Sequence, residues 1–224
     1  MRALLRGLTP AFVAILLWGC MGTNQAEQPK TGDSGLPVAT FAGGCFWCVE
    51  AGFEKVPGVV SAISGYTGGH TPNPSYEQVS SGRTGHREAV EVRYDPRIIG
   101  YDQLLQAFWR MVDPTDNGGQ FPDRGEQYTT AIWYHTEEQR VAAEKSKAAL
   151  AASGRYDKAV VTPILPASRF YKAEEKHQDY YKNHAASYRF YRYFSGRDDF
   201  LEKTWGKDLH LDFGKGLTEA SPSH

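Results

Sequence analysis

The chain of 224 residues is long enough to bury the core of one large domain or of two small ones. With 41% hydrophobic and 23% charged residues, its composition excludes wholesale disorder. A formal net charge of −1 excludes a global basic field, so we expect no nucleic acid among its partners. Three cysteines, Cys20, Cys45 and Cys48, exclude both a disulfide scaffold and a zinc site built from four cysteines.

The N-terminus has the pattern of a signal peptide. Arg2 and Arg6 precede a mostly apolar run over residues 8–18, about half the roughly 20 apolar residues that span a bilayer. The run ends at Leu-Trp-Gly-Cys, which resembles the cleavage site of bacterial lipoproteins, although Trp18 stands where those signals favour a small residue. The resemblance implies that Cys20 is lipidated and becomes the new N-terminus. An ordinary signal peptide with an incidental cysteine is the alternative.

Three segments of different composition divide the chain. Residues 1–19 form the predicted lipoprotein signal peptide, and residues 20–36 are small and polar, as is typical of a flexible tether. Residues 37–224 carry the patterns of a folded domain with a C-terminal extension. We expect a protein exported to the bacterial periplasm or cell envelope, held on the membrane by its N-terminal lipid, and monomeric.

The first predicted element of the domain is a buried strand over residues 38–41, which two glycines end. A helix follows, with one apolar face formed by Phe46, Val49, Phe53 and Val56. The next elements are a strand at 59–64, a loop at 65–85, an alternating strand at 89–94, an amphipathic helix over Leu104, Leu105, Phe108 and Val112, a loop at 113–127 and a strand at 129–134.

A capping box, residues 136–139, opens a long helix that runs to about residue 152, and a strand follows at 160–165. The first six elements come in the order strand, helix, strand, strand, helix, strand. That order is typical of a split βαβ, or ferredoxin-like, core. We therefore expect a single α+β domain with long connecting loops.

The segment after Phe170 interleaves aromatic and basic residues. The aromatic residues are Tyr171, Tyr180, Tyr181, Tyr188, Phe190, Tyr191, Tyr193 and Phe194, and the basic ones are Lys182, Arg189, Arg192 and Arg197. Such interleaving is found in proteins that bind single-stranded nucleic acid. The net charge and the predicted export favour instead an extension whose rings pack on the domain while its charges face water.

The chemistry concentrates at Cys45-Phe46-Trp47-Cys48. Cys45 lies at the predicted helix start, where free N–H groups and the helix dipole favour a thiolate. Cys48, three residues later, lies on the same helix face, so the two sulfurs can bridge. In an exported protein such a pair is typically redox-active or oxidised. Two buried structural thiols are the alternative, and a metal site lacks a second pair of ligands nearby in the sequence.

Gly-Cys-Phe-Trp, followed by the acidic Glu50, resembles the signature of the peptide methionine sulfoxide reductase A family. Further stretches similar to the family follow in order at 65–69, 72–76, 85–90, 113–114 and 123–128. The resemblance covers residues 38–183. It implies an enzyme that reduces methionine S-sulfoxide, free or in oxidised proteins, and so repairs oxidative damage. It also implies that no cofactor or metal is bound and that a thioredoxin-like dithiol is the reductant.

The family's functional residues fall on eight positions of this chain. The resemblance assigns the nucleophile to Cys45, the proton donor to Glu88, the oxygen-binding phenols to Tyr76 and Tyr128, the assisting carboxylate to Asp123, and the rings around the substrate methyl group to Phe46 and Trp47. A sulfoxide has an electrophilic sulfur and a poor leaving oxygen, so it needs a thiolate, an acid and fixed donors. We expect burial to raise the pKa of Glu88. Judged by spacing alone, Glu88 is a solvated carboxylate and both tyrosines are core residues.

Cys48, the eighth position, is expected to condense with a Cys45 sulfenic acid to give a disulfide, which the dithiol then reduces. One common form of the family has glycine here and resolving cysteines near the C-terminus, but this chain has no cysteine after Cys48. Two other hypotheses remain open. A general thiol–disulfide oxidoreductase would leave Glu88 without a purpose, and a surface lipoprotein that binds a ligand in an aromatic pocket would keep its function after Cys45→Ser.

Overall fold

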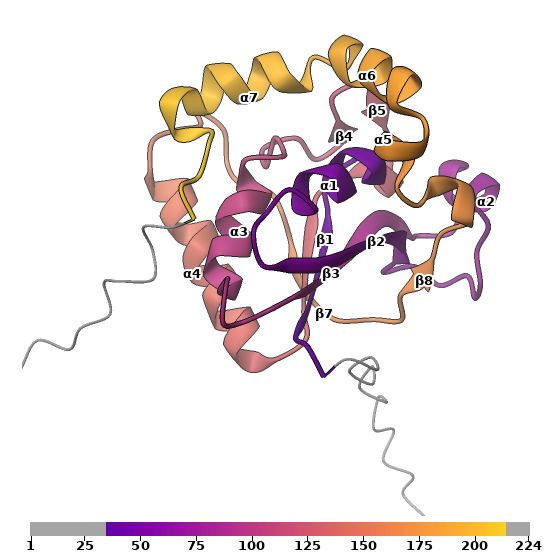
Figure 1. Cartoon of the computed structure of the whole chain (residues 1–224), viewed down its shortest axis with the longest axis horizontal. Helices are drawn as coiled ribbons and strands as arrows, with labels where there is room; N and C mark the ends of the chain where they lie inside the picture. The colour runs from indigo at the N-terminus through magenta and orange to yellow at the C-terminus, as the bar shows by residue number, and fades with distance from the viewer. Residues whose placement is uncertain (1–34, 214–224) are drawn as a thin grey trace, which may run out of the picture.

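The computed structural model describes residues 35–213, so the predicted signal peptide, Cys20 and nearly all of the tether lie outside the described residues. The described part is built on a six-stranded sheet (Figure 1). Its strands are, from edge to edge, β7 (Ile164–Pro166), β6 (Ala131–Tyr134), β1 (Val38–Ala42), β3 (Arg87–Tyr94), β2 (Val59–Thr67) and β8 (Tyr171–Lys172). None of the helices within these residues is long and apolar enough to cross a membrane.

The central strands are antiparallel to their neighbours. β3 lies between β1 and β2 and is antiparallel to both, while β6 is antiparallel to β1 on its other side. β7 extends the sheet at one edge and is parallel to β6. β8 extends it at the other edge and pairs with the end of β2. All five residues of β1 are buried because the strand lies in the middle of the sheet with both faces covered.

Three helices pack against the sheet: α1 (Phe46–Phe53), α3 (Tyr101–Trp109) and α4 (Glu137–Ala152). The ring of Phe41 in β1 stacks on Phe53 of α1 at 4.8 Å and on Phe108 of α3 at 5.0 Å between centroids. Removing one such buried ring typically costs about 3–5 kcal/mol of stability. The main core therefore lies between the sheet and these helices, and it holds α1, with the cysteine pair at its start, firmly over the strands.

Several boundaries differ from the prediction. The first helix ends at Phe53 rather than at Val56, and the strand predicted at 160–165 begins only at Ile164. Thr136 caps α4 by accepting from the N–H of Gln139, but the capping box is not formed. The Gln139 carbonyl accepts instead from the backbone N–H of His135, and its amide donates to the carbonyl of Val38 at the sheet.

The two long loops of the prediction contain short elements. The first holds α2 (Tyr76–Ser80), which Ser75 and Gln78 begin with a capping box. The second holds the hairpin of β4 (Gly119–Gln120) and β5 (Asp123–Arg124) and the 3₁₀ turn η1 (Glu126–Tyr128). Elements of two to five residues are too short to leave a hydrophobic period in the sequence.

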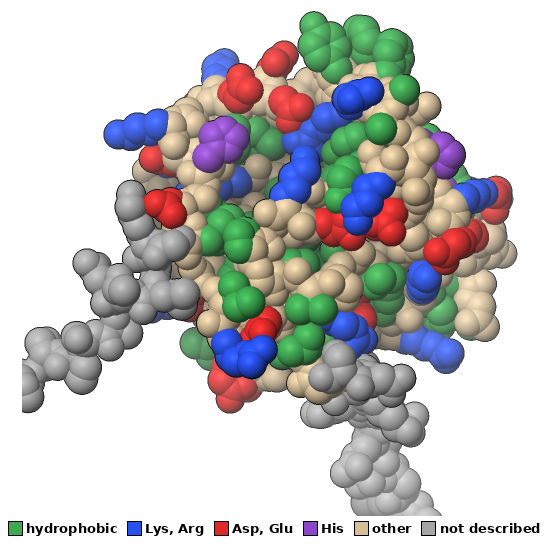
Figure 2. All heavy atoms as spheres, viewed as in Figure 1, with side chains coloured by type: hydrophobic (Ala, Val, Ile, Leu, Met, Phe, Trp, Pro, Cys, Tyr) green, Lys and Arg blue, Asp and Glu red, His purple; other side chains and the backbone are tan. Residues whose placement is uncertain are grey.

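The C-terminal extension forms η2 (Glu175–His177), α5 (Tyr180–Asn183), α6 (Ala185–Phe194), α7 (Arg197–Trp205) and η3 (Gly206–Asp208). Figure 1 shows α5, α6 and α7 passing over α1. Tyr180, Tyr181, Tyr188 and Tyr191 pack on the domain and Lys182 and Arg189 are exposed, as expected for this extension. The expectation is wrong for Arg197, which is 1% exposed, and for Phe190, Tyr193 and Phe194, which are 66–78% exposed. Figure 2 shows hydrophobic side chains gathered at this end of the molecule.

Candidate active site

A tight turn places the cysteine pair at the start of α1. Gly44 has φ +82, and a Cβ there would lie 2.5 Å from Cβ of Gln120. Glycine is therefore required at this position. Cys45 follows as the N-cap of α1, and Cys48 lies one turn further on, 6% and 2% exposed respectively. Both are thiols, and they pack with Tyr188 of α6.

The surroundings of the pair favour a negative charge on Cys48, whereas the sequence favours one on Cys45. Burial, then a hydrogen bond with Cys48, then the nearby carboxyl groups of Glu88 and Asp123, raise the pKa of Cys45. The same hydrogen bond lowers the pKa of Cys48 against burial, with a further contribution from Arg197. In the resting pair, burial and the hydrogen bond with Cys48 thus oppose the thiolate that the start of α1 favours at Cys45.

Glu88 lies on β3 directly behind the start of α1. Its side chain is 3% exposed, and its Oε2 accepts a 2.9 Å hydrogen bond from the backbone N–H of Phe46. Burial raises its pKa to about 8, although the Phe46 N–H acts in the opposite direction. At pH 7 this side chain is therefore a carboxylic acid with a proton to donate, which confirms the predicted direction of the shift.

Tyr76 begins α2 and Tyr128 ends η1, and the two phenols hydrogen-bond to each other. Burial, and then the nearby Glu88, raise the pKa of Tyr76 to about 12 and raise the pKa of Tyr128 above its usual range. Both phenols interact electrostatically with Cys45. Glu88, Tyr76 and Tyr128 thus surround the first sulfur with groups that stay protonated and can donate hydrogen bonds.

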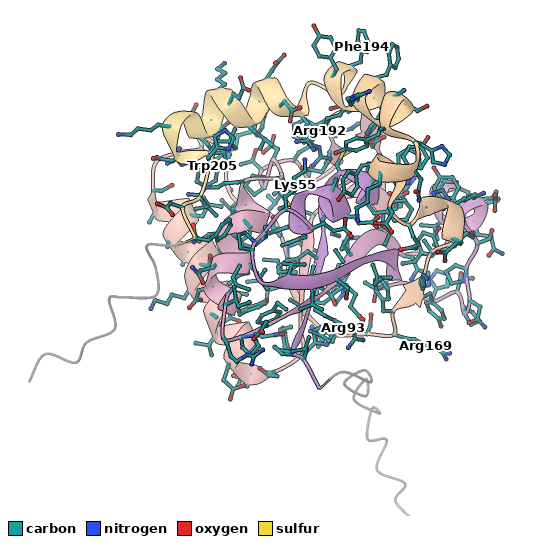
Figure 3. All side chains as sticks on the ribbon, in the orientation of Figure 1. Lys55, Arg93, Arg169, Arg192, Phe194 and Trp205 are labelled. Carbon is teal, nitrogen blue, oxygen red and sulfur yellow. The ribbon has the colours of Figure 1, made fainter. Side chains whose placement is uncertain are left out.

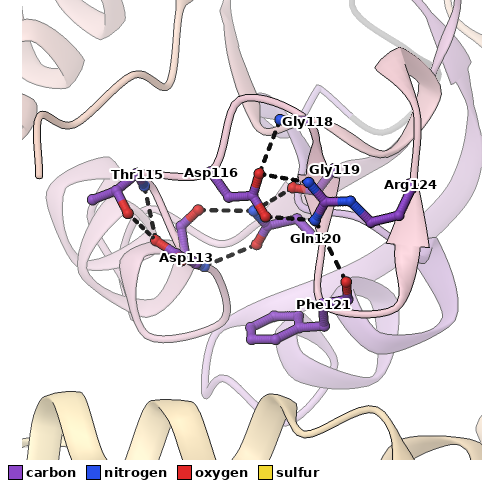
Figure 4. A network of polar contacts seen from close by, with 8 residues as sticks. All are labelled: Asp113, Thr115, Asp116, Gly118, Gly119, Gln120, Phe121 and Arg124. Carbon is purple, nitrogen blue, oxygen red and sulfur yellow. Dashed lines mark hydrogen bonds and ion pairs between the residues drawn. The ribbon is translucent and has the colours of Figure 1, made fainter.

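Asp123 follows a loop whose neighbouring residues form the network of hydrogen bonds and ion pairs in Figure 4. The Gln120 amide brackets the backbone of Asp113, accepting from its N–H and donating to its carbonyl, both at 2.8 Å. Arg124, the residue after Asp123, pairs with Asp116 at 2.5 Å. These contacts on both sides of Asp123 fix its place in the hairpin, where burial raises its pKa.

Trp47 is enclosed by the C-terminal extension. Its ring stacks on Tyr180 at 3.7 Å and meets the ring of Tyr191 edge-on at 6.2 Å. Its indole N–H donates to Nδ1 of His177 at 3.3 Å. Phe46, by contrast, is 1% exposed and packs on His177 at 5.3 Å, so of the two predicted substrate rings Trp47 has the greater exposure.

Several residues of the site were missed by the sequence reasoning. The phenol of Tyr191 donates to the carboxylate of Asp123, and Tyr188 and Arg192 both hydrogen-bond to Cys48. Positions 188, 191 and 192 share one helix face by their spacing of three and four. That spacing is the signal that the sequence carries, but it does not distinguish a face that packs on the domain from one that contacts a site.

Three carboxylates, Glu50, Glu54 and Asp179, offer oxygen atoms within 4.8 Å of one another. Lys182 lies 2.6 Å from both Glu54 and Asp179, and Glu50 accepts from the Ser64 hydroxyl at 2.5 Å. These contacts make the group an ion-pair network around an ammonium rather than a site that needs a metal ion.

Two of the cavities on the described surface bear on the site. The larger, of about 450 Å³, is lined by Arg87, Glu126 and neighbouring residues and includes none of the predicted site residues. The smaller, of about 200 Å³, reaches Cys48 between α1, α6 and α7. Figure 3 labels two of its lining residues, Lys55 and Arg192, below Phe194. A second approach to the cysteine pair therefore exists beside the polar cluster around Cys45.

Comparisons with known proteins identify the relatives of this chain. The family model described as peptide methionine sulfoxide reductase matches residues 37–209. The chain is similar to the peptide methionine sulfoxide reductases MsrA of Bacillus licheniformis and Listeria innocua, with 54% and 55% identity over 170 residues. These matches cover 76% of the chain and 94% and 96% of the relatives.

Solved structures give the same result for the fold. The reduced form of Mxr1 from Saccharomyces cerevisiae matches with a TM-score of 0.65 and 30% identity, covering 69% of this chain and 90% of that one. Methionine sulfoxide reductase A of Corynebacterium diphtheriae matches with a TM-score of 0.59 and 34% identity, covering 69% and 77%. The mixed α/β fold described above is therefore shared with these structures.

Proposed function

The chain belongs to the peptide methionine sulfoxide reductase family and is an oxidoreductase that reduces methionine sulfoxide, and from this premise we propose how its own residues carry out the reaction. The reaction runs through a sulfenic acid on Cys45 and a Cys45–Cys48 disulfide. A thioredoxin-like dithiol then returns the pair to thiols. No bound cofactor takes part in this cycle.

The first step transfers oxygen from the substrate to Cys45. The sulfoxide oxygen accepts hydrogen bonds from Tyr76 and Tyr128 and takes a proton from Glu88. The Glu88 carboxylate that this leaves then takes the proton of the Cys45 thiol. A bond between the Cys45 sulfur and oxygen forms as the substrate sulfur–oxygen bond breaks. Methionine sulfur is reduced by two electrons and Cys45 is oxidised by two, so no other reactant is needed.

One observation carries this proposal: a buried Glu88 that is protonated at pH 7, with its pKa at about 8, beside the Cys45 thiol. A buried acid of this kind is what a poor leaving oxygen requires. A general thiol–disulfide oxidoreductase has no use for it. Trp47, half-buried against Tyr180, is positioned as a wall for the substrate methyl group.

The second step forms the disulfide. Cys48 lies one helical turn from Cys45 and hydrogen-bonds to it, which supports its role as the resolving cysteine. The cavity that reaches Cys48 offers a dithiol a path to the bridge. Specificity for the S epimer, in free or protein-bound methionine sulfoxide, is part of the proposal because separate enzymes serve the two epimers.

Methionine release with dithiothreitol and with a thioredoxin-like protein tests the cycle. Cys45→Ser should release no methionine with either reductant. Cys48→Ser should release one methionine per chain and then fail to cycle with the thioredoxin-like protein. Full steady-state turnover of Cys48→Ser with that protein would contradict the resolving role, and activity of Cys45→Ser would contradict the whole proposal.

We also propose a ferredoxin-like core for the fold, which the strand order β6-β1-β3-β2 supports. The export and lipid-anchoring proposal rests on the leader and Cys20. Labelled fatty acid should enter the chain in bacteria and be absent from Cys20→Ala. Equal labelling of the two proteins, or none in either, would refute lipidation of Cys20. Such an anchor places repair of oxidised proteins in the cell envelope.

A further inference from the structure

Arg197, the first residue of α7, is a buried cation. Its side chain is 1% exposed, and its Nη1 donates to the carbonyls of Gly43 at 3.1 Å and Met111 at 2.6 Å. One face of the guanidinium lies 4.5 Å from the ring of Phe121. These contacts hold the charge directly beneath the turn that leads into Cys45.

Two donors of this guanidinium are unused. Nε and Nη2 are buried without a hydrogen-bond partner among residues 35–213, and within the same range no carboxylate lies at ion-pair distance from Arg197. A buried charge without an anion is costly, and native proteins seldom retain one without a use. An anion facing Arg197 therefore belongs to the working site.

Two groups of the site interact electrostatically with Arg197, the Asp123 carboxylate and the ionised form of Cys48. Asp123 also accepts a hydrogen bond from Tyr191, whereas Cys48 lies one turn after the turn that Arg197 holds. A Cβ on Gly44, the residue before Cys45, would lie 3.0 Å from Nη2, so the free donor faces the start of the motif. After the hydrogen bond from Cys45, the charge of Arg197 is the largest influence that favours the ionised form of Cys48, ahead of the charge of Arg192. Arg192 also hydrogen-bonds to Cys48, but its charge is shared with Asp198 at 2.5 Å.

We propose that Arg197 is a positioning residue that holds the negative charge on Cys48 and thereby prepares this cysteine to attack the Cys45 sulfenic acid. The inference rests on the proposed function, in which Cys48 is the resolving cysteine. Arg197 lies outside residues 38–183, over which the chain resembles the family in sequence motifs. It also gives the C-terminal extension a chemical role.

The step balances without another reactant. The Cys48 thiolate supplies an electron pair to the Cys45 sulfur, forming the S–S bond. The sulfur–oxygen bond of the sulfenic acid breaks, and the oxygen leaves with its pair and takes a proton from Glu88 to give water. Arg197 keeps the attacking sulfur ionised at neutral pH without being consumed.

Several titratable or charged groups face Cys48 and shape its titration. They are Cys45 at the start of α1, Lys55 after α1, Glu88 of β3, Tyr188, Tyr191 and Arg192 of α6, and Arg197 and Asp198 at the start of α7. Of these, Arg197 combines near-complete burial with donors that have no partner in the described structure. Among the groups that face Cys48, we therefore expect only the replacement of Cys45 to change the titration of Cys48 more than the replacement of Arg197.

The test uses the full chain with Cys20→Ser, so that two thiols remain. The variants are Arg197→Gln and Arg197→Lys, with Arg155→Gln and Arg155→Lys as controls. Arg155 donates to the carbonyl of Thr204 at 2.8 Å and pairs with Asp208, so it holds the other end of α7 without facing the cysteines. The measurements are the pH profile of Cys48 alkylation, assigned by peptide mass, and the rates of methionine release and of disulfide formation in a single turnover.

Arg197→Gln should raise the pH midpoint of Cys48 alkylation by about one unit or more, a tenfold loss of thiolate at neutral pH. It should slow disulfide formation about tenfold while methionine release stays within about twofold of the parent. Arg197→Lys should give a smaller shift in the same direction, because one ammonium cannot both hold the two carbonyls and face the sulfur. If Arg197→Gln does not fold, the alkylation profile and the disulfide rate of Arg197→Lys, compared with those of Arg155→Lys, test the inference.

An alkylation profile and a disulfide rate unchanged in the Arg197 variants would overturn the inference and leave the proposed function intact. Equal effects in the Arg155 variants would overturn it too, since they would show a general loosening of α7. Absence of methionine release in the parent would instead refute the proposed function. The three results are therefore distinguishable.

Discussion

Replacing Glu88 by Gln should make the protein more stable at neutral pH and nearly inactive. Gln has the same shape, and its carbonyl can still accept from the Phe46 N–H that now binds Oε2 at 2.9 Å. It has no acidic proton to give to the sulfoxide oxygen. Loss of a general acid typically lowers kcat by about 10²–10⁴-fold.

The stability effect follows from the pKa. Glu88 has a pKa of about 8 in the folded chain, against an ordinary value of 4.5. Between these two values the unfolded chain is ionised while the folded chain keeps its proton, so the wild type loses stability as pH rises. From pH 5 to pH 7.5 this loss amounts to about 3 kcal/mol, and Glu88→Gln does not suffer it.

Urea unfolding of the reduced proteins at several pH values between 5 and 8 measures this difference. The free energy of unfolding of Glu88→Gln should exceed that of the wild type by an amount that grows with pH. Glu126→Gln, on an exposed side chain nearby, is the control and should show no such trend. A difference between Glu88→Gln and wild type that stays constant with pH would refute the reasoning, whatever the activity.

Three further outcomes can be checked with the same proteins. Tyr128→Phe should lower kcat with dithiothreitol about tenfold or more and leave KM nearly unchanged, because its phenol acts on the oxygen as charge develops; an unchanged kcat would remove it from the mechanism. Tyr191→Phe removes the hydrogen bond that lowers the pKa of Asp123, so the acid limb of the pH–rate profile should move to higher pH; a shift to lower pH would contradict this. Gly44→Ala should lower the free energy of unfolding by about 2 kcal/mol or more in urea, because φ is +82 and the new Cβ meets Gln120; a neutral effect would show that the turn relaxes.

Periodicity was sufficient to place the longer elements of the fold. The helix over 137–152, strand β1 and its two partners β3 and β6 left clear apolar patterns. The hairpin of β4 and β5 could not be predicted this way, because a pair of two-residue strands is held by Gln120 and Arg124 side chains rather than by a hydrophobic face.

The residues of the site also fall into those that the sequence could predict and those that only the fold reveals. Local chemistry pointed to Cys45 and Cys48, and the resemblance supplied Glu88, Tyr76 and Tyr128. The sign of the Cys45 shift could not be predicted, because it depends on burial by distant segments. Arg197 could not be found either, since a basic residue at a helix start is ordinarily solvated and only the fold shows its two donors to be buried.

The covering of α1 by α5, α6 and α7 has a consequence for how the protein is made. The two cysteines belong to the first helix of the domain, but Tyr180, Tyr191 and Arg197 lie more than 130 residues later in the chain. A polypeptide synthesised from its N-terminus therefore carries two ordinary thiols until its last helices dock. The cysteines meet these neighbours only after the last helices have docked, which keeps a nascent chain from entering the oxidative cycle early.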